Sequence, residues 1–186
     1  MSSTNNLCPE VTDTATMPLS ELADHIERTH HVYLRSEFPR LDEVTQKVAS
    51  VHGDKDPRLH QVRDTFLALA GELSNHMMKE EQILFPMLRQ LAASDETPRF
   101  HCGMLANPIG QMEMEHEQAD SALVRLRELT DGFAIPDWAC NSYRDLLDAL
   151  EHFEQDLHEH IHKENNVLFP RALEMEQRKN ATRTGN

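Results

Sequence analysis

The chain has 186 residues, enough for one domain with a substantial hydrophobic core. Its formal net charge of −14 leaves no basic face for nucleic acid or an anionic membrane surface, so neither is expected as a partner. Aromatic residues make up only 5% and glycine is scarce, which favours an all-α fold. No apolar run approaches the roughly 20 residues that span a bilayer.

The N-terminal segment is polar and has no basic stretch followed by an apolar one, so no secretory signal is expected. Residues 1–17 are predicted to be disordered. The cysteines are odd in number and widely spaced, at Cys8, Cys102 and Cys140. They form no disulfide or metal-binding pattern, and a reducing cytoplasm is the predicted location.

The first predicted helix covers residues 19–50 and contains Pro39, a potential kink. A short turn follows. Asp56 and Pro57 are typical of an N-cap and a first helical residue, and they open a second helix that extends to about Ala92.

A long loop separates the second helix from the third. Asn107 and Pro108 repeat the capping signal, and the third helix extends to about Thr130. Gly132 stops this helix, since glycine readily adopts the left-handed conformation that ends helices. A fourth helix is predicted over residues 137–175.

Short connections make consecutive helices antiparallel neighbours. The sequence therefore predicts an up-down-up-down four-helix bundle over residues 18–176, with a flexible tail at 177–186.

Each helix has one apolar face, found by stepping alternately three and four residues. In the second and fourth helices this face is interrupted once, by a histidine and a glutamate one turn apart. In the first and third helices it carries a single histidine. The interrupting residues are His31, His76, Glu80, His116, His160 and Glu164.

The two halves of the chain repeat one another. Residues 76–86 match residues 160–170 at an offset of 84, and both contain His-x-x-Lys-Glu followed by Leu-Phe-Pro. An offset of 85 pairs His31 with His116 in the first helix of each half. The chain is therefore predicted to be a duplicated helical hairpin.

A bare carboxylate on an apolar face costs several kcal/mol, and two facing each other would repel. A pair of metal cations removes this cost and employs the histidines. Imidazole with carboxylate suits iron, zinc, copper or manganese, and spacing does not decide among these metals. The alternative, ordinary core histidines beside ion-paired glutamates, does not account for the repeated pattern.

The repeated segments, with His31 and His116, resemble the hemerythrin-like di-iron proteins. Within that group they resemble the repair-of-iron-centres (YtfE/ScdA-type) family, over roughly residues 20–175. The resemblance implies two iron ions per chain with an oxo or hydroxo bridge. The ligands that it implies are His31, His76, Glu80, His116, His160 and Glu164.

The resemblance also implies a role in the nitrosative and oxidative stress response of bacteria. The chain would support repair of damaged iron–sulfur proteins, bind nitric oxide, or do both. A dioxygen carrier or sensor and an iron-buffering protein are the alternatives. No catalytic group independent of the metals is evident, so enzyme activity is left open. The family's usual N-terminal domain, with its vicinal cysteine pair, is expected to be missing, because only Cys8 precedes the first helix.

Several further polar residues lie near the predicted ligands. His30 is the rival of His31, and the repeat favours His31. His52 matches a position where the family has a histidine, although an ordinary loop residue is the simpler interpretation. Glu72 and Glu115 either support the ligands or are surface carboxylates.

Overall fold

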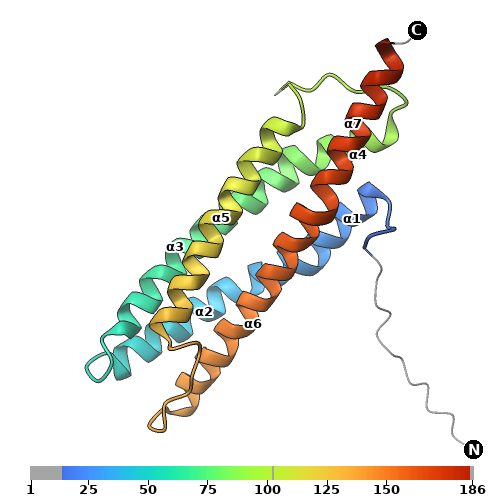
Figure 1. Cartoon of the computed structure of the whole chain (residues 1–186). Helices are drawn as coiled ribbons and strands as arrows, with labels where there is room; N and C mark the ends of the chain where they lie inside the picture. The colour runs from blue at the N-terminus through green and yellow to red at the C-terminus, as the bar shows by residue number, and fades with distance from the viewer. Residues whose placement is uncertain (1–13, 102, 185–186) are drawn as a thin grey trace, which may run out of the picture.

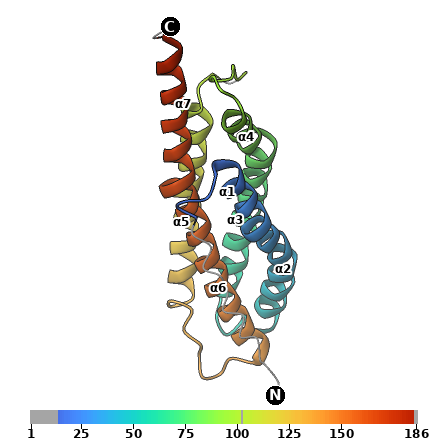
Figure 2. The same cartoon turned by 90° about the vertical axis from the view of Figure 1, so that its right-hand side faces the viewer.

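The structure, a computed structural model, describes residues 14–101 and 103–184. Within them the chain forms four long helical rods, and Figures 1 and 2 show consecutive rods running in opposite directions along one long axis. The predicted all-α, four-helix bundle is confirmed. The elements, with π-helical segments named η, are α1 (Leu19–Ile26), η1 (Glu27–His31) and α2 (Val32–His52); α3 (Arg58–Lys79), η2 (Glu80–Leu84) and α4 (Phe85–Ala93); α5 (Ala106–Leu129); and α6 (Asn141–Lys163), η3 (Glu164–Leu168) and α7 (Phe169–Thr184).

For the first three rods the predicted helix ends agree with the structure within a few residues, and local chemistry explains them. Asp56 accepts a hydrogen bond from the backbone N–H of Arg58 at 3.1 Å, so it caps the start of α3 as expected. Beyond α5 the chain turns through Gly132, whose φ is +74° and whose N–H donates to the carbonyl of Arg127 at 2.7 Å.

The fourth rod differs from the prediction at both ends. It begins at Asn141 and not near residue 137, because Cys140 is extended and a turn closes from Ala139 to Pro136. It continues to Thr184, through most of the predicted flexible tail. There Lys179 donates to the carbonyls of Leu91, at 2.5 Å, and Ser94, which stabilises the last turn of α4.

The predicted disordered segment, 1–17, falls largely outside the described residues. The part that is described, 14–17, forms a turn against α7. Arg171 donates to the carbonyl of Met17 at 2.6 Å. No helix in the described part of the chain is long and apolar enough to cross a lipid bilayer.

Two apolar clusters fill the bundle, one on either side of its middle. On the second rod, Leu73 and Met77 belong to the larger cluster and Leu84 to the smaller one. His76 and Glu80 lie between Leu73 and Leu84 on the same rod and are also buried. The hydrophobic core is thus divided by a layer of buried polar side chains.

Candidate metal centre

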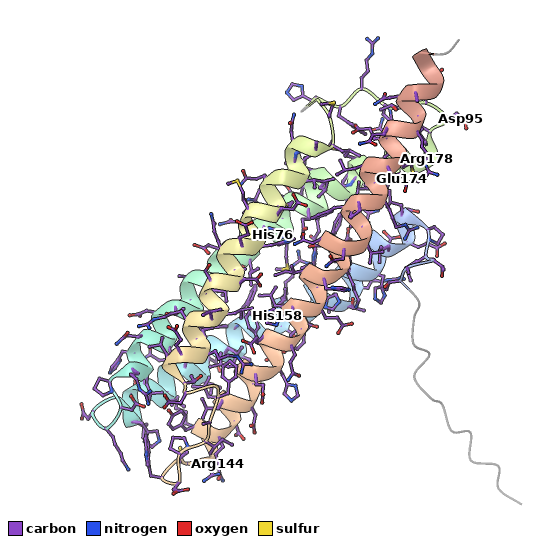
Figure 3. The ribbon with its side chains drawn as sticks, viewed as in Figure 1. His76, Asp95, Arg144, His158, Glu174 and Arg178 are labelled. Carbon is purple, nitrogen blue, oxygen red and sulfur yellow. The ribbon has the colours of Figure 1, made fainter. Side chains whose placement is uncertain are left out.

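All six residues that the sequence predicted as ligands lie in this buried layer, here named the polar belt. Each rod contributes at least one of them, and Figure 3 shows His76 about half-way along the bundle. None exposes more than 2% of its surface. The exposed fractions are 0% for His31, 2% for His76, 0% for Glu80, 2% for His116, 1% for His160 and 0% for Glu164.

The belt divides into two groups of four ligand atoms, each group lying within 4.8 Å. One group is His31, Glu80, His160 and Glu164, and the other is His76, Glu80, His116 and Glu164. Each group takes one histidine from each half of the duplicated chain. Both share the two glutamates, as a pair of metal positions bridged by carboxylates requires.

Each of the two carboxylates lies between two imidazoles, and each carboxylate oxygen is close to one of them. Oε2 of Glu80 lies 3.3 Å from Nε2 of His31, and Oε1 lies 3.3 Å from Nε2 of His76. Oε2 of Glu164 lies 3.1 Å from Nε2 of His116, and Oε1 lies 3.2 Å from Nε2 of His160.

Although these nitrogen–oxygen distances are short, most of the contacts do not have the geometry of a hydrogen bond. Within residues 14–101 and 103–184, four buried atoms have no partner of hydrogen-bond geometry: both oxygens of Glu80, Oε2 of Glu164 and Nε2 of His31. Nε2 of His76 and Nε2 of His116 face each other at 3.0 Å, where only one of them can carry a proton to share. Such convergent acceptors are costly when buried, and cations between them remove the cost, so the donor set fits two metal ions.

The π-helical turns lie where the ligands do. His31 ends η1, Glu80 begins η2 and Glu164 begins η3. Segments of this kind are frequent at functional sites, because the wider turn re-aims side chains. Helical periodicity alone did not predict these turns. The repeated prolines were the available signal: Pro86 and Pro170 lack an N–H and crowd the carbonyl four residues earlier, inside η2 and η3.

Three of the four imidazoles are oriented by a hydrogen bond at Nδ1, the ring nitrogen that faces away from the belt. His31 bonds Glu81 at 2.7 Å, and His116 bonds Asn165 at 2.9 Å. His76 bonds Glu115 at 2.9 Å. A partner at the outer nitrogen fixes the ring and its tautomer and leaves Nε2 free for a metal.

Cations in turn hold the outer carboxylates. Arg35 donates to Glu81, at 2.6 Å, and Lys79 forms an ion pair with Glu115. Burial raises the pKa of Glu115, but Lys79, Gln111 and His76 outweigh burial and lower this pKa to about 2. Glu115 is therefore ionised at neutral pH and supports His76, the supporting role considered in the sequence analysis.

Charges within the metal-free belt are strongly coupled. Burial lowers the pKa of His76, yet Glu80, Glu164 and Glu115 together raise it to about 9. Burial likewise raises the pKa of Glu164, yet His160 and His116 hold it well below its usual value. Protons on the imidazoles thus compensate the carboxylates, and a bound metal would have to displace them.

His30 is buried almost as deeply as the belt, at 3% exposure, but belongs to neither group of four. Its Nδ1 lies 2.9 Å from Asp156, and its Nε2 lies 2.8 Å from Lys163. Its ring stacks on His160 at 5.3 Å. The structure therefore brings His31, and not its rival, into the belt.

The remaining candidates lie outside the belt. His52 stacks on Tyr143 at 5.8 Å near the end of the first rod, and its Nε2 is 3.1 Å from the sulfur of Cys140. Glu72 is exposed and, with Lys79 and Glu115, lines a cavity of about 200 Å³ that reaches His76.

Fold and site together define the class of protein: a helical bundle with a buried metal-binding centre of histidines and carboxylates. Residues 22–172 match the hemerythrin HHE cation binding domain, and the chain belongs to this family. The resemblance predicted from the repeated motif is thereby confirmed.

Among its relatives is the iron-sulfur cluster repair protein YtfE of Pectobacterium atrosepticum, 42% identical over 159 residues, which are 84% of this chain and 66% of that protein. The iron-sulfur cluster repair protein DnrN of Neisseria gonorrhoeae is 38% identical over 157 residues, 84% of this chain and 93% of the relative. YtfE of Salmonella schwarzengrund is 38% identical over 161 residues, 87% and 69% of the two chains. The chain thus spans just under two thirds of the Pectobacterium protein.

Proposed function

We propose that this chain is a di-iron protein of the nitrosative and oxidative stress response that supports the repair of iron–sulfur clusters. The observation that carries the proposal is the pair of four-residue groups sharing Glu80 and Glu164. The names of the relatives, all iron-sulfur cluster repair proteins, support the choice of iron and of repair. A cytoplasmic location, predicted from the cysteine pattern, belongs to the same proposal.

In this proposal each of the four histidines would hold one iron through Nε2, and the two glutamates would be shared by both ions, with an oxo or hydroxo group as a further bridge. Two redox-active irons would supply electron transfer and coordination positions open to a diatomic ligand. The outer partners Glu81, Glu115 and Asn165 hold three of the rings in register. The apolar clusters on either side would limit the access of water to the belt along the bundle axis.

The small ligand that we propose is nitric oxide, with dioxygen as its competitor. The cavity of about 200 Å³ beside His76 leads from the surface toward the belt between α3 and α5. Two histidines and two shared carboxylates per ion leave each iron short of six ligands. We therefore expect the reduced protein to bind nitric oxide at both irons, and its dioxygen adduct to decay to the oxidised state.

A direct test combines metal analysis with a repair assay. Protein loaded anaerobically should contain about two irons per chain, and the loaded form should restore activity to a dehydratase whose [4Fe–4S] cluster nitric oxide has damaged. Metal-free protein is the control and should restore none. Reversible release of dioxygen under vacuum, without any repair, would instead favour the carrier function. Release of iron to any chelator, without repair, would favour iron buffering.

A further inference from the structure

The duplication makes the two metal positions nearly equivalent, so differences between them can be identified residue by residue. In the second rod of each half the offset of 84 pairs His76 with His160 and Lys79 with Lys163. In the first rod the offset of 85 pairs Glu115 with His30. His76 and His160 therefore occupy equivalent helix positions but have different neighbours on the side away from the metal positions. The neighbour of His76 is the carboxylate of Glu115, and the neighbour of His160 is the imidazole of His30.

Around His76 the outer arrangement is complete. Its Nδ1 lies 2.9 Å from Oε2 of Glu115. Glu115 also pairs with Lys79 and accepts from Gln111 at 2.8 Å, so the carboxylate is itself held in place. A ligand histidine supported in this way is pre-oriented and more basic toward the metal.

His160 has no equivalent supporting hydrogen bond among the described residues. Nδ1 of His160 is buried and has no hydrogen-bond partner in the described part of the chain. At the place of Glu115 stands His30, whose ring lies parallel to that of His160, at an interplanar angle of 2°. His30 is turned to Lys163 and Asp156, and stacking fixes the His160 ring less firmly than a hydrogen bond would.

The surface next to His30 is also more open. A cavity of about 560 Å³ lies there, against about 200 Å³ beside His76. It is lined by potential cation ligands, His25, Asp156, Glu159 and His162, together with His30 itself. An ion that leaves the His160 side would meet imidazole and carboxylate groups at once.

We propose that the two irons are held unequally, and that the iron bound by His31 and His160 leaves first, past His30 into the larger cavity. The inference rests on the proposed di-iron site and deepens it, because a repair protein that supplies iron needs one ion that can leave. Loss of an outer partner of a ligand histidine typically weakens metal binding roughly 10–100-fold. A difference of that order separates the two positions.

The test measures iron release from the anaerobically loaded, reduced protein to an excess of a ferrous chelator. Two phases of about one iron each are expected, with rate constants that differ roughly 10–100-fold. His30→Glu would give His160 a carboxylate partner paired with Lys163, equivalent to Glu115 paired with Lys79. This variant should slow the fast phase toward the rate of the slow one. Glu115→Gln removes the partner of His76 and should speed the slow phase, whether or not the first variant folds.

His158→Gln, an exposed position on the same rod, is the control and should leave both phases unchanged. Release of two irons in a single phase overturns the inference while leaving the di-iron proposal intact. Two phases that neither His30→Glu nor Glu115→Gln alters also overturn it. A wild-type chain that never loads two irons overturns the di-iron proposal and this inference together.

Discussion

The polar belt and the end of the bundle near residues 131–140 both place histidines among packed helices, with opposite outcomes. At the end, the His52 ring stacks on Tyr143 at 5.8 Å and lies tilted against Trp138 at 5.6 Å, and its Nε2 has Cys140 as neighbour. In the belt, four imidazoles converge on two carboxylates, and three of the four carboxylate oxygens have no hydrogen-bond partner among the described residues. His52 is satisfied by neighbouring protein groups, whereas the belt presents a set of donor atoms that fits metal cations.

The largest expected effect comes from removing a bridging carboxylate. Glu80→Ala and Glu164→Ala should each reduce the iron content from about two per chain to below one, because each glutamate contacts both positions. The melting temperature of the loaded protein should fall with it, since metal binding stabilises the folded chain. Iron analysis and thermal denaturation measure both. The exposed Glu113, changed to Ala, is the matched control; full iron content in both belt variants would refute the assignment.

Proton release should accompany metal binding in the belt and be absent elsewhere. The pKa of His76, about 9 in the metal-free chain, means that this ring is protonated at neutral pH. Because a ligand imidazole must be neutral, loading ferrous iron at about pH 7.5 should release protons, and affinity should rise with pH toward about 9. Titration calorimetry in buffers of different ionisation enthalpy counts those protons. No proton release would contradict the charge coupling described for the belt.

Two adjacent histidines provide a sharper comparison. His31→Ala should remove iron from the belt and change the iron spectrum, whereas His30→Ala should still load two irons when iron is in excess. Mössbauer spectra of the two variants under the same loading conditions distinguish them. The reverse outcome would mean that the first rod presents its other histidine to the metal.

The smallest effect is expected at the bundle end. His52→Ala should leave the iron content unchanged and lower the free energy of unfolding of the metal-free protein by about 1 kcal/mol, the usual size of a lost ring contact. Chemical denaturation and iron analysis of the same preparation measure both. Iron loss in this variant would show that the two regions are not independent.

Helical phase was sufficient to predict five of the six belt residues. The apolar face of the second and fourth helices is interrupted only once, in the same way in both repeats. This pattern singles out His76, Glu80, His160 and Glu164 as the buried polar residues. The choice between His31 and His30 needed the repeat, because residues next to each other on a helix differ by only about 100°.

The supporting groups were less predictable: Glu115 was one of two candidates for this role, and Glu81 and Asn165 were not foreseen. Glu81 and Glu115 contact His31 and His76 across helix interfaces, and such contacts depend on how the rods pack. Coordinates were likewise needed to see that Nδ1 of His160 has no hydrogen-bond partner among the described residues. The end of the fourth rod was misjudged because Lys179 stabilises it through carbonyls of α4, distant in sequence.

The most direct test of the central claim is the anomalous scattering of iron in crystals of the loaded protein. Two iron peaks are predicted, one between His31 and His160 and the other between His76 and His116, with Glu80 and Glu164 beside both. A single peak, or a peak outside the belt, would contradict the account.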